Sequence, residues 1–496
     1  MTNPKIVDNK SSVDSYNKNC IQPYAQNPMY WQYKGRPTLL FGGSDRDNIF
    51  HWAGEGNRLT DHLDLLRSCG GNYVRCTMSS REYTEHGYRW DLLPYPFKKL
   101  ASGKYDLDQW DQSYWEKLRI LLHETGKRDI IVQLEIWDMW NESGDSEDAE
   151  GGLGWYCSPW NPNNNVNYNW QDSPLLVRGK TEFYNPFFRA AMTNDPVLVP
   201  YQRKFVGRLV DECLAFDHVL FQIDNESGID LAVGEYWAKF IGERAGTANK
   251  RAYVCDSRNF RRPSKYVTTV FQDWENPEIR NVITRPDVYS FCDISQNNGN
   301  SGQEQYDNLV WYISKVKQYG KRPVNHTKCY HFNWPTGGDY ANRTSPSDAE
   351  AGAKFWRAVF GGAASIRFHR YTPSYTPDGI REGFGLTPQG QAHIKSMRML
   401  VESMNVFEMT PENGVLGDRA RNEAYALVNP GSEYAVYFTG DGDRRVNIDL
   451  TATPRSLTET WLDVLGNRWT AARTIEGGKV HTLSCPDSGQ WVATLK

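Results

Sequence analysis

A short apolar run that ends in acidic and amide side chains is the part of this chain best suited to chemistry. Residues 218–223, His-Val-Leu-Phe-Gln-Ile, are too few for a typical helix and predict a buried strand. Asp224, Asn225 and Glu226 follow directly. Parallel α/β folds bind their ligands at the carboxyl ends of such strands. The carboxylate of Glu226 can transfer a proton there, or it can simply cap the next helix.

Other acidic residues end or closely follow predicted strands. Strand-end acids often cap a helix, because the helix dipole favours negative charge at its amino end. Each of them therefore has a structural interpretation beside the catalytic one. Glu382 is an outlying candidate, in the loop after the last predicted strand. The four strand-end acids that accompany Glu226 are Asp45, Glu135, Asp138 and Asp293.

The elements that must position these residues alternate between strands and helices. Apolar residues at helical spacing predict helices between the strands, for example at 110–124, 200–216 and 306–319. Such alternation is typical of a (β/α)₈ barrel with a parallel sheet. The eight predicted strands are 38–43, 72–78, 129–137, 218–223, 251–256, 287–294, 322–328 and 362–369.

The pattern changes near the C-terminus. From residue 413 onwards, short alternating runs separated by turn residues predict a small all-β sandwich. The expected fold class is therefore α/β, a (β/α)₈ TIM barrel followed by a β-sandwich. We expect a tail over residues 1–26, the catalytic barrel over 27–411 and the sandwich over 412–496.

Aromatic residues are unusually frequent, at 13% of the chain with 18 tryptophans. Sugar rings stack on such faces, although most aromatic side chains fill cores. Residues 158–170 combine many asparagines with Trp160 and Trp170 inside a long insertion from 140 to 200. Disordered segments are poor in aromatics, so we expect a lid that faces the substrate.

The chain resembles the clan A glycoside hydrolases at two of the predicted strands. In that clan an asparagine–glutamate pair ends the fourth barrel strand, where Asn225 and Glu226 stand here. An arginine occupies the place of Arg75 near the end of the second strand. The resemblance implies that Glu226 is the general acid/base, that Asn225 holds the sugar and that Arg75 supports the catalytic carboxylate. The whole layout is similar to apiosidase-like barrels, whose C-terminal domain is named for collagen binding.

This resemblance implies hydrolysis of a glycosidic bond in a plant or algal polysaccharide or oligosaccharide. One carboxyl group protonates the leaving oxygen, and a second attacks the anomeric carbon or activates a water molecule. The two groups lie about 5–5.5 Å apart in retaining enzymes and about 6.5–9.5 Å apart in inverting enzymes. Carbohydrate is the expected partner, and the oligomeric state is not predicted.

The sequence departs from the clan at the seventh strand. The clan's nucleophile is a glutamate there, but residues 324–330 read Val-Asn-His-Thr-Lys-Cys-Tyr, and Lys328 stands close to its place. The missing glutamate favours inversion. Asp293 is the preferred partner of Glu226, ahead of Asp138 and Glu135.

Polar and aromatic residues at the same strand ends are expected to form a binding cup, together with Arg367. A metal ion would need a cluster such as His326, His369 and Asp293. No short ligand motif supports such a cluster, so we expect neither a metal nor a cofactor. The residues expected to bind substrate are Asn225, Arg75, Asp45, Trp137, Trp160, Trp170, His326, Lys328, Trp334 and His369.

Two other functions stay open. Lys328 with a nearby histidine suits a lyase that abstracts a proton beside the carboxylate of an acidic sugar. Loss of the seventh-strand glutamate also suits a barrel that binds carbohydrate without catalysis. A lyase releases a product that absorbs in the near ultraviolet, a hydrolase releases only reducing ends, and a binding protein releases neither.

Composition and charge narrow the classes of protein to which the chain can belong. A net charge of −4 gives no basic footprint for nucleic acid or a membrane surface. No apolar run reaches the roughly 18 residues that span a bilayer. Nine cysteines without framework spacing predict free thiols. Residues 1–19 lack the apolar core of a signal peptide, so the chain as it stands is expected in the cytoplasm, or outside it if the natural N-terminus was trimmed.

Overall fold

The structure is a computed structural model of the 496-residue chain. Two residues singled out above, Trp334 and Glu382, lie outside the part that it describes, as do residues 139–153 and 178–184 of the insertion. The described residues are 18–46, 48–80, 82–84, 87–89, 94–138, 154–177, 185–226, 228–258, 272–330, 348–370 and 383–496.

A strand lies in each of the eight predicted places. Parallel pairing joins them in the orders β12-β11-β10-β5, β13-β14 and β15-β4. Their bounds are β4 (Leu40–Gly43), β5 (Tyr73–Thr77), β10 (Ile131–Trp137), β11 (Val219–Asp224), β12 (Val254–Cys255), β13 (Cys292–Asp293), β14 (Val324–Asn325) and β15 (Ser365–Phe368).

Backbone hydrogen bonds bridge the three places where these sheets do not pair. Asn72 N donates to the carbonyl oxygen of Phe41 at 3.0 Å, which links β5 to β4. Ser290 N donates to the carbonyl of Val254 at 2.9 Å, beside β12 and β13. The amide of Ala364 donates to Val324 at 2.7 Å, beside β15 and β14. Backbone hydrogen bonds from residues beside these strands thus link one sheet to the next, and β15 pairs with β4.

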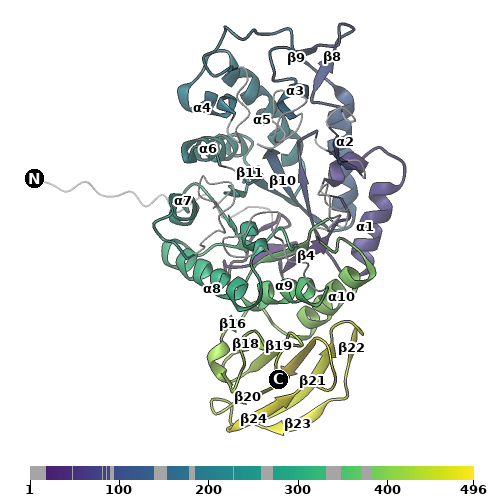
Figure 1. The fold of residues 1–496 in the computed structure, drawn as a ribbon, viewed down its shortest axis with the longest axis vertical. Coiled ribbons are helices and arrows are strands. Elements are labelled where there is room, and N and C mark those ends of the chain that lie inside the picture. The colour runs from purple at the N-terminus through teal and green to yellow at the C-terminus, as the bar shows by residue number, and fades with distance from the viewer. Residues whose placement is uncertain are drawn as a thin grey trace, which may run out of the picture.

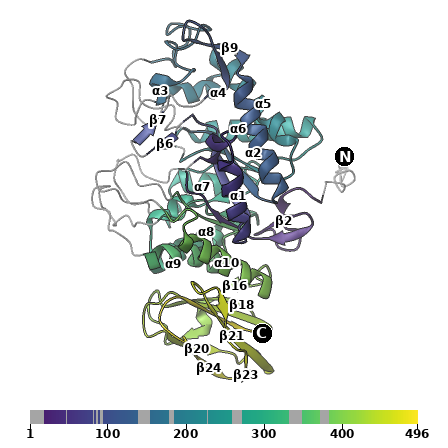
Figure 2. The same ribbon diagram turned by 90° about the vertical axis from the view of Figure 1, so that its right-hand side faces the viewer.

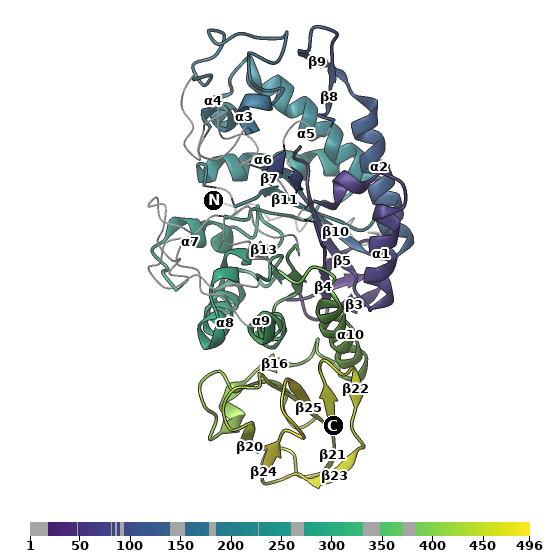
Figure 3. The same cartoon turned by 45° about the vertical axis from the view of Figure 1, so that its right-hand side comes forward.

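Helices connect the strands and pack outside them (Figure 1). In Figure 3, α1 and α2 lie along the outer side of β5 and β10. Two further helices, α3 (Gly154–Cys157) and α4 (Ala190–Thr193), are single turns in the insertion. The connecting helices are α1 (Arg58–Ser68), α2 (Gln112–Lys127), α5 (Leu198–Leu214), α6 (Leu231–Thr247), α7 (Pro277–Thr284), α8 (Gly302–Tyr319), α9 (Asp348–Phe360) and α10 (Pro388–Ser403).

Capping explains where two helices differ from their predictions. The predicted helix at 110–124 begins later, because the Asp111 side chain accepts a hydrogen bond from Ser113 N at 2.9 Å. Trp110 instead ends β9 (Tyr105–Trp110), which forms a hairpin with β8 (Phe97–Lys99). We did not predict α7, which is short and begins after an Asn276 cap with proline at its first position.

The segment expected to be a tail is packed from residue 18 onwards. The side chain of Ile21 is buried, and its amide donates to Asp217 at 2.7 Å. Strand β1 (Gln22–Pro23) pairs with β2 (Trp31–Tyr33), which forms the predicted hairpin with β3 (Arg36–Thr38). Residues 18–26 of the predicted tail thus contribute a short strand and a buried side chain. One more hairpin joins β6 (Glu82–Thr84) and β7 (Gly87–Arg89).

The described part of the insertion is folded onto the core rather than standing free as a lid. Trp155 and Trp160 are 3% and 4% exposed. The amide of Asn161 donates to the carbonyl of Trp155 at 3.1 Å, and that of Asn165 donates to Pro159 at 3.1 Å. These side chains satisfy backbone groups that no helix or strand pairs, which explains the many asparagines.

Two antiparallel sheets form the C-terminal region, in the orders β16-β18-β19-β25-β21-β22, with β23 on β21, and β17-β20-β24. They enclose a separate hydrophobic cluster. Figure 2 shows them beyond α9 and α10. Trp356 of α9 stacks on Tyr437 of β19 at 5.4 Å, so the large sheet packs against these helices. The bounds are β16 (Thr410–Pro411), β17 (Leu416–Gly417), β18 (Ala424–Asn429), β19 (Glu433–Phe438), β20 (Arg445–Asp449), β21 (Ser456–Asp463), β22 (Arg468–Trp469), β23 (Arg473–Glu476), β24 (Val480–Ser484) and β25 (Trp491–Leu495).

Two sequence expectations can be compared with the structure directly. All nine cysteines lie in the described ranges and all are free thiols, as predicted. Among the described residues, no helix combines the length and apolarity needed to cross a bilayer.

Candidate active site

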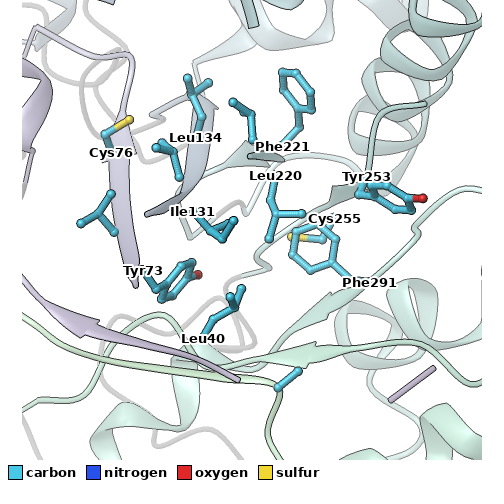
Figure 4. Close-up of a cluster of buried hydrophobic side chains, with 14 of the residues drawn as sticks. Leu40, Tyr73, Cys76, Ile131, Leu134, Leu220, Phe221, Tyr253, Cys255 and Phe291 are labelled. Carbon is cyan, nitrogen blue, oxygen red and sulfur yellow. The ribbon is translucent and has the colours of Figure 1, made fainter. Parts of the chain in front are cut away.

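The eight parallel strands β4, β5 and β10–β15 are called the strand ring below. The side chains inside it change from apolar to polar along the strands. Alternate side chains share one face of a strand, so Ile131, Gln133 and Glu135 of β10 point the same way. Leu220 and Gln222 repeat this order on the neighbouring β11. Figure 4 shows the apolar end, where Leu40, Tyr73, Ile131 and Leu220 gather. The charged candidates therefore lie towards the carboxyl ends, where α/β barrels carry their sites.

Arg75 and Glu135 form a buried ion pair there. Arg75 Nε donates to Glu135 Oε1 at 2.6 Å, and Arg75 Nη2 contacts Oε2. The side chains are 1% and 0% exposed. Gln222 and Thr77 also donate to this carboxylate, at 2.7 and 3.1 Å. Glu135 is thus held by four donor groups, which suits a residue that orients Arg75.

Asn225 connects this pair to the seventh strand. Its Oδ1 accepts hydrogen bonds from Arg75 Nη2 at 2.9 Å and from Lys328 Nζ at 2.8 Å. Two cations on one oxygen fix which way the amide faces. The amide nitrogen then points to Asp138 Oδ1, 3.5 Å away. The predicted residues Asn225, Arg75, Lys328, Asp138 and Glu135 therefore lie together.

Glu226 contacts the lysine that stands where the clan has its nucleophile. Lys328 Nζ lies 2.5 Å from Glu226 Oε1, and their side chains are 3% and 12% exposed. A contacting ammonium stabilises the ionised carboxylate. Glu226 also has a φ of +56°, a left-handed conformation that is costly for a side chain other than glycine. Such strain is concentrated at functional sites.

Asp293 lies deeper in the ring than a catalytic partner would need. It is 1% exposed and accepts hydrogen bonds from Ser295 N at 2.7 Å, Gln133 at 2.9 Å and Thr327 at 3.0 Å. Burial raises the pKa of this carboxyl, and these donors partly oppose the rise. Its catalytic role stays a prediction, and its surroundings favour a structural role that ties β13 and β14 to β10.

A chain of buried amide and hydroxyl groups beneath the site escaped the sequence analysis. Tyr73 donates to Gln133 Oε1 at 2.6 Å, and Asn325 donates to the same oxygen at 2.8 Å. Gln133 in turn contacts Gln222. Such interior polar groups need partners, and here they supply one another. The available signal was a glutamine two residues before a carboxylate inside an apolar strand, at Gln133 and again at Gln222.

The predicted tryptophans occupy different surroundings. Trp137 and Trp160 are 3% and 4% exposed, and each packs against Phe187 and Phe205. This packing makes them part of the wall rather than open stacking faces, so their sugar-binding role stays a prediction. Trp170 is half-buried and donates to Asn163 at 2.9 Å.

Three residues from the first and eighth strands lie near the same end of the ring. Asp45 is half-buried and accepts a hydrogen bond from Leu386 N at 2.6 Å. Arg367 donates to the carbonyl of Thr327 at 3.1 Å and to His369 Nδ1 at 3.2 Å. His369 is buried at the end of β15, so its predicted contact with substrate stays untested.

His326 is buried, and it stands two residues before Lys328 in the sequence. Neither ring nitrogen has a hydrogen-bond partner among the described residues. Burial, with a contribution from Lys354, lowers its pKa to about 4, so the ring is neutral. In the described ranges, no three His, Cys, Asp or Glu side chains are grouped as a metal ion would require. A direct role for His326 in binding sugar stays a prediction.

Buried histidines are expected to make the fold sensitive to acid. Burial lowers the pKa of His218 and His326 to about 4 and that of His393 to about 3, from the ordinary 6.5. Between about pH 6.5 and pH 4 the unfolded chain therefore binds more protons than the folded chain. The free energy of unfolding is highest above this window and decreases as the pH falls through it. Full protonation of each histidine accounts for roughly 3 to 5 kcal/mol, most for His393. Burial raises the pKa of Asp256 and Asp293, which opposes this loss near their ordinary 3.8.

Urea unfolding between about pH 7.5 and pH 5 measures the effect. His393→Gln should reduce the slope, because glutamine can still accept the hydrogen bond of Trp356 Nε1, which is 3.1 Å from His393 Nδ1. His123→Gln replaces an exposed histidine and is the control. A flat stability profile for the wild type would contradict the prediction.

Comparisons with known proteins identify solved structures that share this fold. No family model matches the chain, and no curated protein matches it. A structure described as a glycoside hydrolase superposes with a TM-score of 0.61 at 12% identity, over 96% of this chain and 97% of its own. A glycoside hydrolase family 5 protein from Bacteroides vulgatus gives 0.61 at 13% identity, over 96% and 93%. These proteins share its fold. At such identities the chemistry has to be argued from this chain's own residues.

Proposed function

We propose that this chain is a glycoside hydrolase that cleaves a plant or algal polysaccharide or oligosaccharide. The observation that carries this proposal is the placement of Glu226. It has a left-handed backbone conformation at the carboxyl end of the fourth strand, and its carboxylate contacts Lys328 of the seventh. We infer a closed (β/α)₈ barrel over residues 27–411 and a β-sandwich over 412–496. The backbone hydrogen bonds between successive strands and the separate C-terminal cluster support this division.

Glu226 is the proposed general acid, which protonates the leaving oxygen. Asp138 is the better candidate for the base that activates water, because Asn225 joins it to the site while Asp293 is enclosed by protein donors. Asn225 presents its amide nitrogen to the same space and is the proposed sugar contact. With no carboxylate at the end of the seventh strand, this arrangement favours inversion.

One observation favours a second function. A general acid must carry a proton, whereas the contact with Lys328 stabilises the charged form of Glu226. A charged carboxylate beside an ammonium suits a lyase, in which Glu226 abstracts a proton and Lys328 neutralises the carboxylate of an acidic sugar. The fold similarity is to structures described as glycoside hydrolases, so hydrolysis remains our first proposal.

Product analysis tests this proposal. The wild type is incubated with neutral and acidic plant and algal glycans, and reducing ends and near-ultraviolet absorbance are followed together. Hydrolysis yields new reducing ends without absorbance. Absorbance that rises with the reducing ends would replace hydrolysis by the lyase. Quenching of tryptophan fluorescence by a glycan that is never cleaved would instead indicate a barrel that only binds carbohydrate.

A further inference from the structure

A cavity lies at the other end of the strand ring from the candidate active site. Its volume is about 460 Å³, which is the size of a small-molecule site. Lys321 and Gly362 line it and precede β14 and β15, so the cavity faces the amino ends of the strands. The hairpin segment 24–30 and residues 407–411, which lead from α10 into the sandwich, form other walls. A ligand bound here is separate from one bound at Glu226.

Hydrogen bonds and aromatic contacts hold the walls of this cavity in place. Asn27 Nδ2 donates to the carbonyl oxygen of Phe407 at 2.8 Å, which ties the hairpin segment to the chain after α10. The ring of Phe407 meets Tyr30 and Tyr24 edge-on, with centroids 5.4 and 6.3 Å apart. The Tyr24 hydroxyl donates to Gln26 at 2.6 Å. The cavity is therefore built into the fold where segments distant in the sequence meet.

The lining combines ring faces with groups that form hydrogen bonds. Tyr24 is half-buried, and Tyr30 and Phe407 are 4% and 7% exposed. Burial raises the pKa of Tyr30 to about 12, so its hydroxyl stays protonated and can donate, and it has no acceptor in the part of the chain that the structure describes. The exposed side chains of Gln26 and Thr410 add further polar groups. A sugar matches this combination, because its ring has an apolar face and its hydroxyls donate and accept hydrogen bonds.

Two lysines make the wall formed by α8 positive. Lys317 lies in the last turn of this helix, and Lys321 follows two residues after its end. Partial burial, and then the charge of Lys321, lower the pKa of Lys317, so the two ammonium groups are close enough to repel each other. Neither forms an ion pair with a carboxylate of the described residues, including Glu408, which also lines the cavity. The helix dipole favours lysines at such an end, and an anion held between them would in addition relieve their repulsion.

We propose that this cavity is a second binding site, for a small sugar that carries a sulfate, phosphate or carboxylate group. The anionic group binds between Lys317 and Lys321, and the sugar ring lies against Tyr24 and Tyr30. The carboxylate of Glu408 accepts a hydrogen bond from a hydroxyl of the same sugar. The inference goes beyond the proposed function, because it depends neither on the role of Glu226 nor on the reaction at the carboxyl ends of the strands.

Calorimetric titration of the full chain tests the site. The probes are glucose, galactose and mannose, each as the 6-sulfate, the 6-phosphate and the uronate, compared with the neutral sugar and with sulfate, phosphate or acetate alone. At least one anionic sugar should bind about tenfold or more tightly than both of its comparators, and which one does so identifies the anionic group. Added salt should weaken this preference, because it screens charges near the surface. Equal affinity of neutral and anionic sugars, or of an anionic sugar and its anion alone, would overturn the proposal.

Variants locate the binding on the protein. The double variant Lys317→Gln, Lys321→Gln should lose the preference for the anionic sugar, and it should fold normally because both side chains are exposed. Lys315→Gln is the matched control. Lys315 belongs to the same helix, but its ammonium lies over the ring of Trp274 at 5.1 Å, away from the cavity lining. Tyr24→Ala should weaken the binding of neutral and anionic sugars alike, since it removes a ring face and no charge.

One further variant separates this site from the candidate active site. Lys328→Gln removes the ammonium beside Glu226 and should leave binding at the cavity unchanged. Binding that persists in the double lysine variant but is lost in Lys328→Gln would place the anionic sugar at the active site. That result would overturn the second site and leave the proposed function standing. Conversely, failure to cleave any glycan would count against the proposed function without affecting the cavity.

Discussion

Glu226→Gln should lower kcat by about 10²- to 10⁴-fold on the glycan that the wild type cleaves, the usual contribution of a positioned acid or base. Glutamine keeps the size of the side chain and an oxygen that accepts from Lys328, but it cannot transfer a proton. Glutamine has to adopt the same left-handed backbone conformation as glutamate, at a φ of +56°, so the fold should be retained. Steady-state kinetics of reducing-end release, beside the circular dichroism of both proteins, measures the effect.

Glu212→Gln is the matched control for this loss. Glu212 is similarly shielded, at 18% exposure against 12% for Glu226, and it also pairs with a cation, Arg119, at 2.7 Å. It lies on α5, outside the strand ring. Its replacement should leave kcat within about twofold, since it makes no contact with the proposed site. Activity of Glu226→Gln equal to that of the wild type would remove the central assignment.

Arg75→Met should lower the free energy of unfolding by about 3–5 kcal/mol, because it leaves the carboxylate of Glu135 buried without its cation. Thr77 and Gln222 still donate to that carboxylate, but neither carries a charge. The amide of Asn225 also loses one of the two cations that orient it. Urea unfolding gives the stability, and turnover should fall further than stability alone explains because Asn225 is no longer fixed.

An exposed ion pair of similar geometry provides the control. Arg244 makes two hydrogen bonds to Asp211, and the side chains are 40% and 52% exposed. Arg244→Met should cost less than about 1 kcal/mol, since water screens both charges. The double variant Arg75→Met, Glu135→Met should recover much of the loss, because both buried charges are then absent. Equal costs for Arg75→Met and Arg244→Met would show that burial of the pair has no energetic consequence.

The order of elements could be predicted because each element is specified locally. An apolar run of strand length, such as 131–137, and the helical spacing in 198–214 are properties of neighbouring residues. Arg75, Glu135 and Asn225 stand near the ends of predicted strands, so the sequence also predicted that they lie at the same end of the sheet. Some strands were predicted too long, as at β14, where only Val324 and Asn325 pair with β13.

Side-chain surroundings could not be predicted in this way. Trp137 ends a strand beside acidic residues, as a sugar-binding tryptophan would, yet five aromatic side chains from distant segments enclose it. Asp293 carries the sequence pattern of a strand-end catalyst, but donors from β10 and from beyond β14 occupy its oxygens. Burial of this kind depends on which segments meet, and composition does not encode that.

The sequence by itself determined a barrel-type alternation of strands and helices, a strand-rich C-terminal region and a glutamate at the end of the fourth strand. It also showed that lysine replaces the expected carboxylate of the seventh. Only the tertiary structure decided that this lysine and Glu226, 102 residues apart, form a contacting pair. Periodicity fixes where a strand ends and which way its side chains alternate, whereas a contact between strand ends depends on the register and curvature of the whole ring.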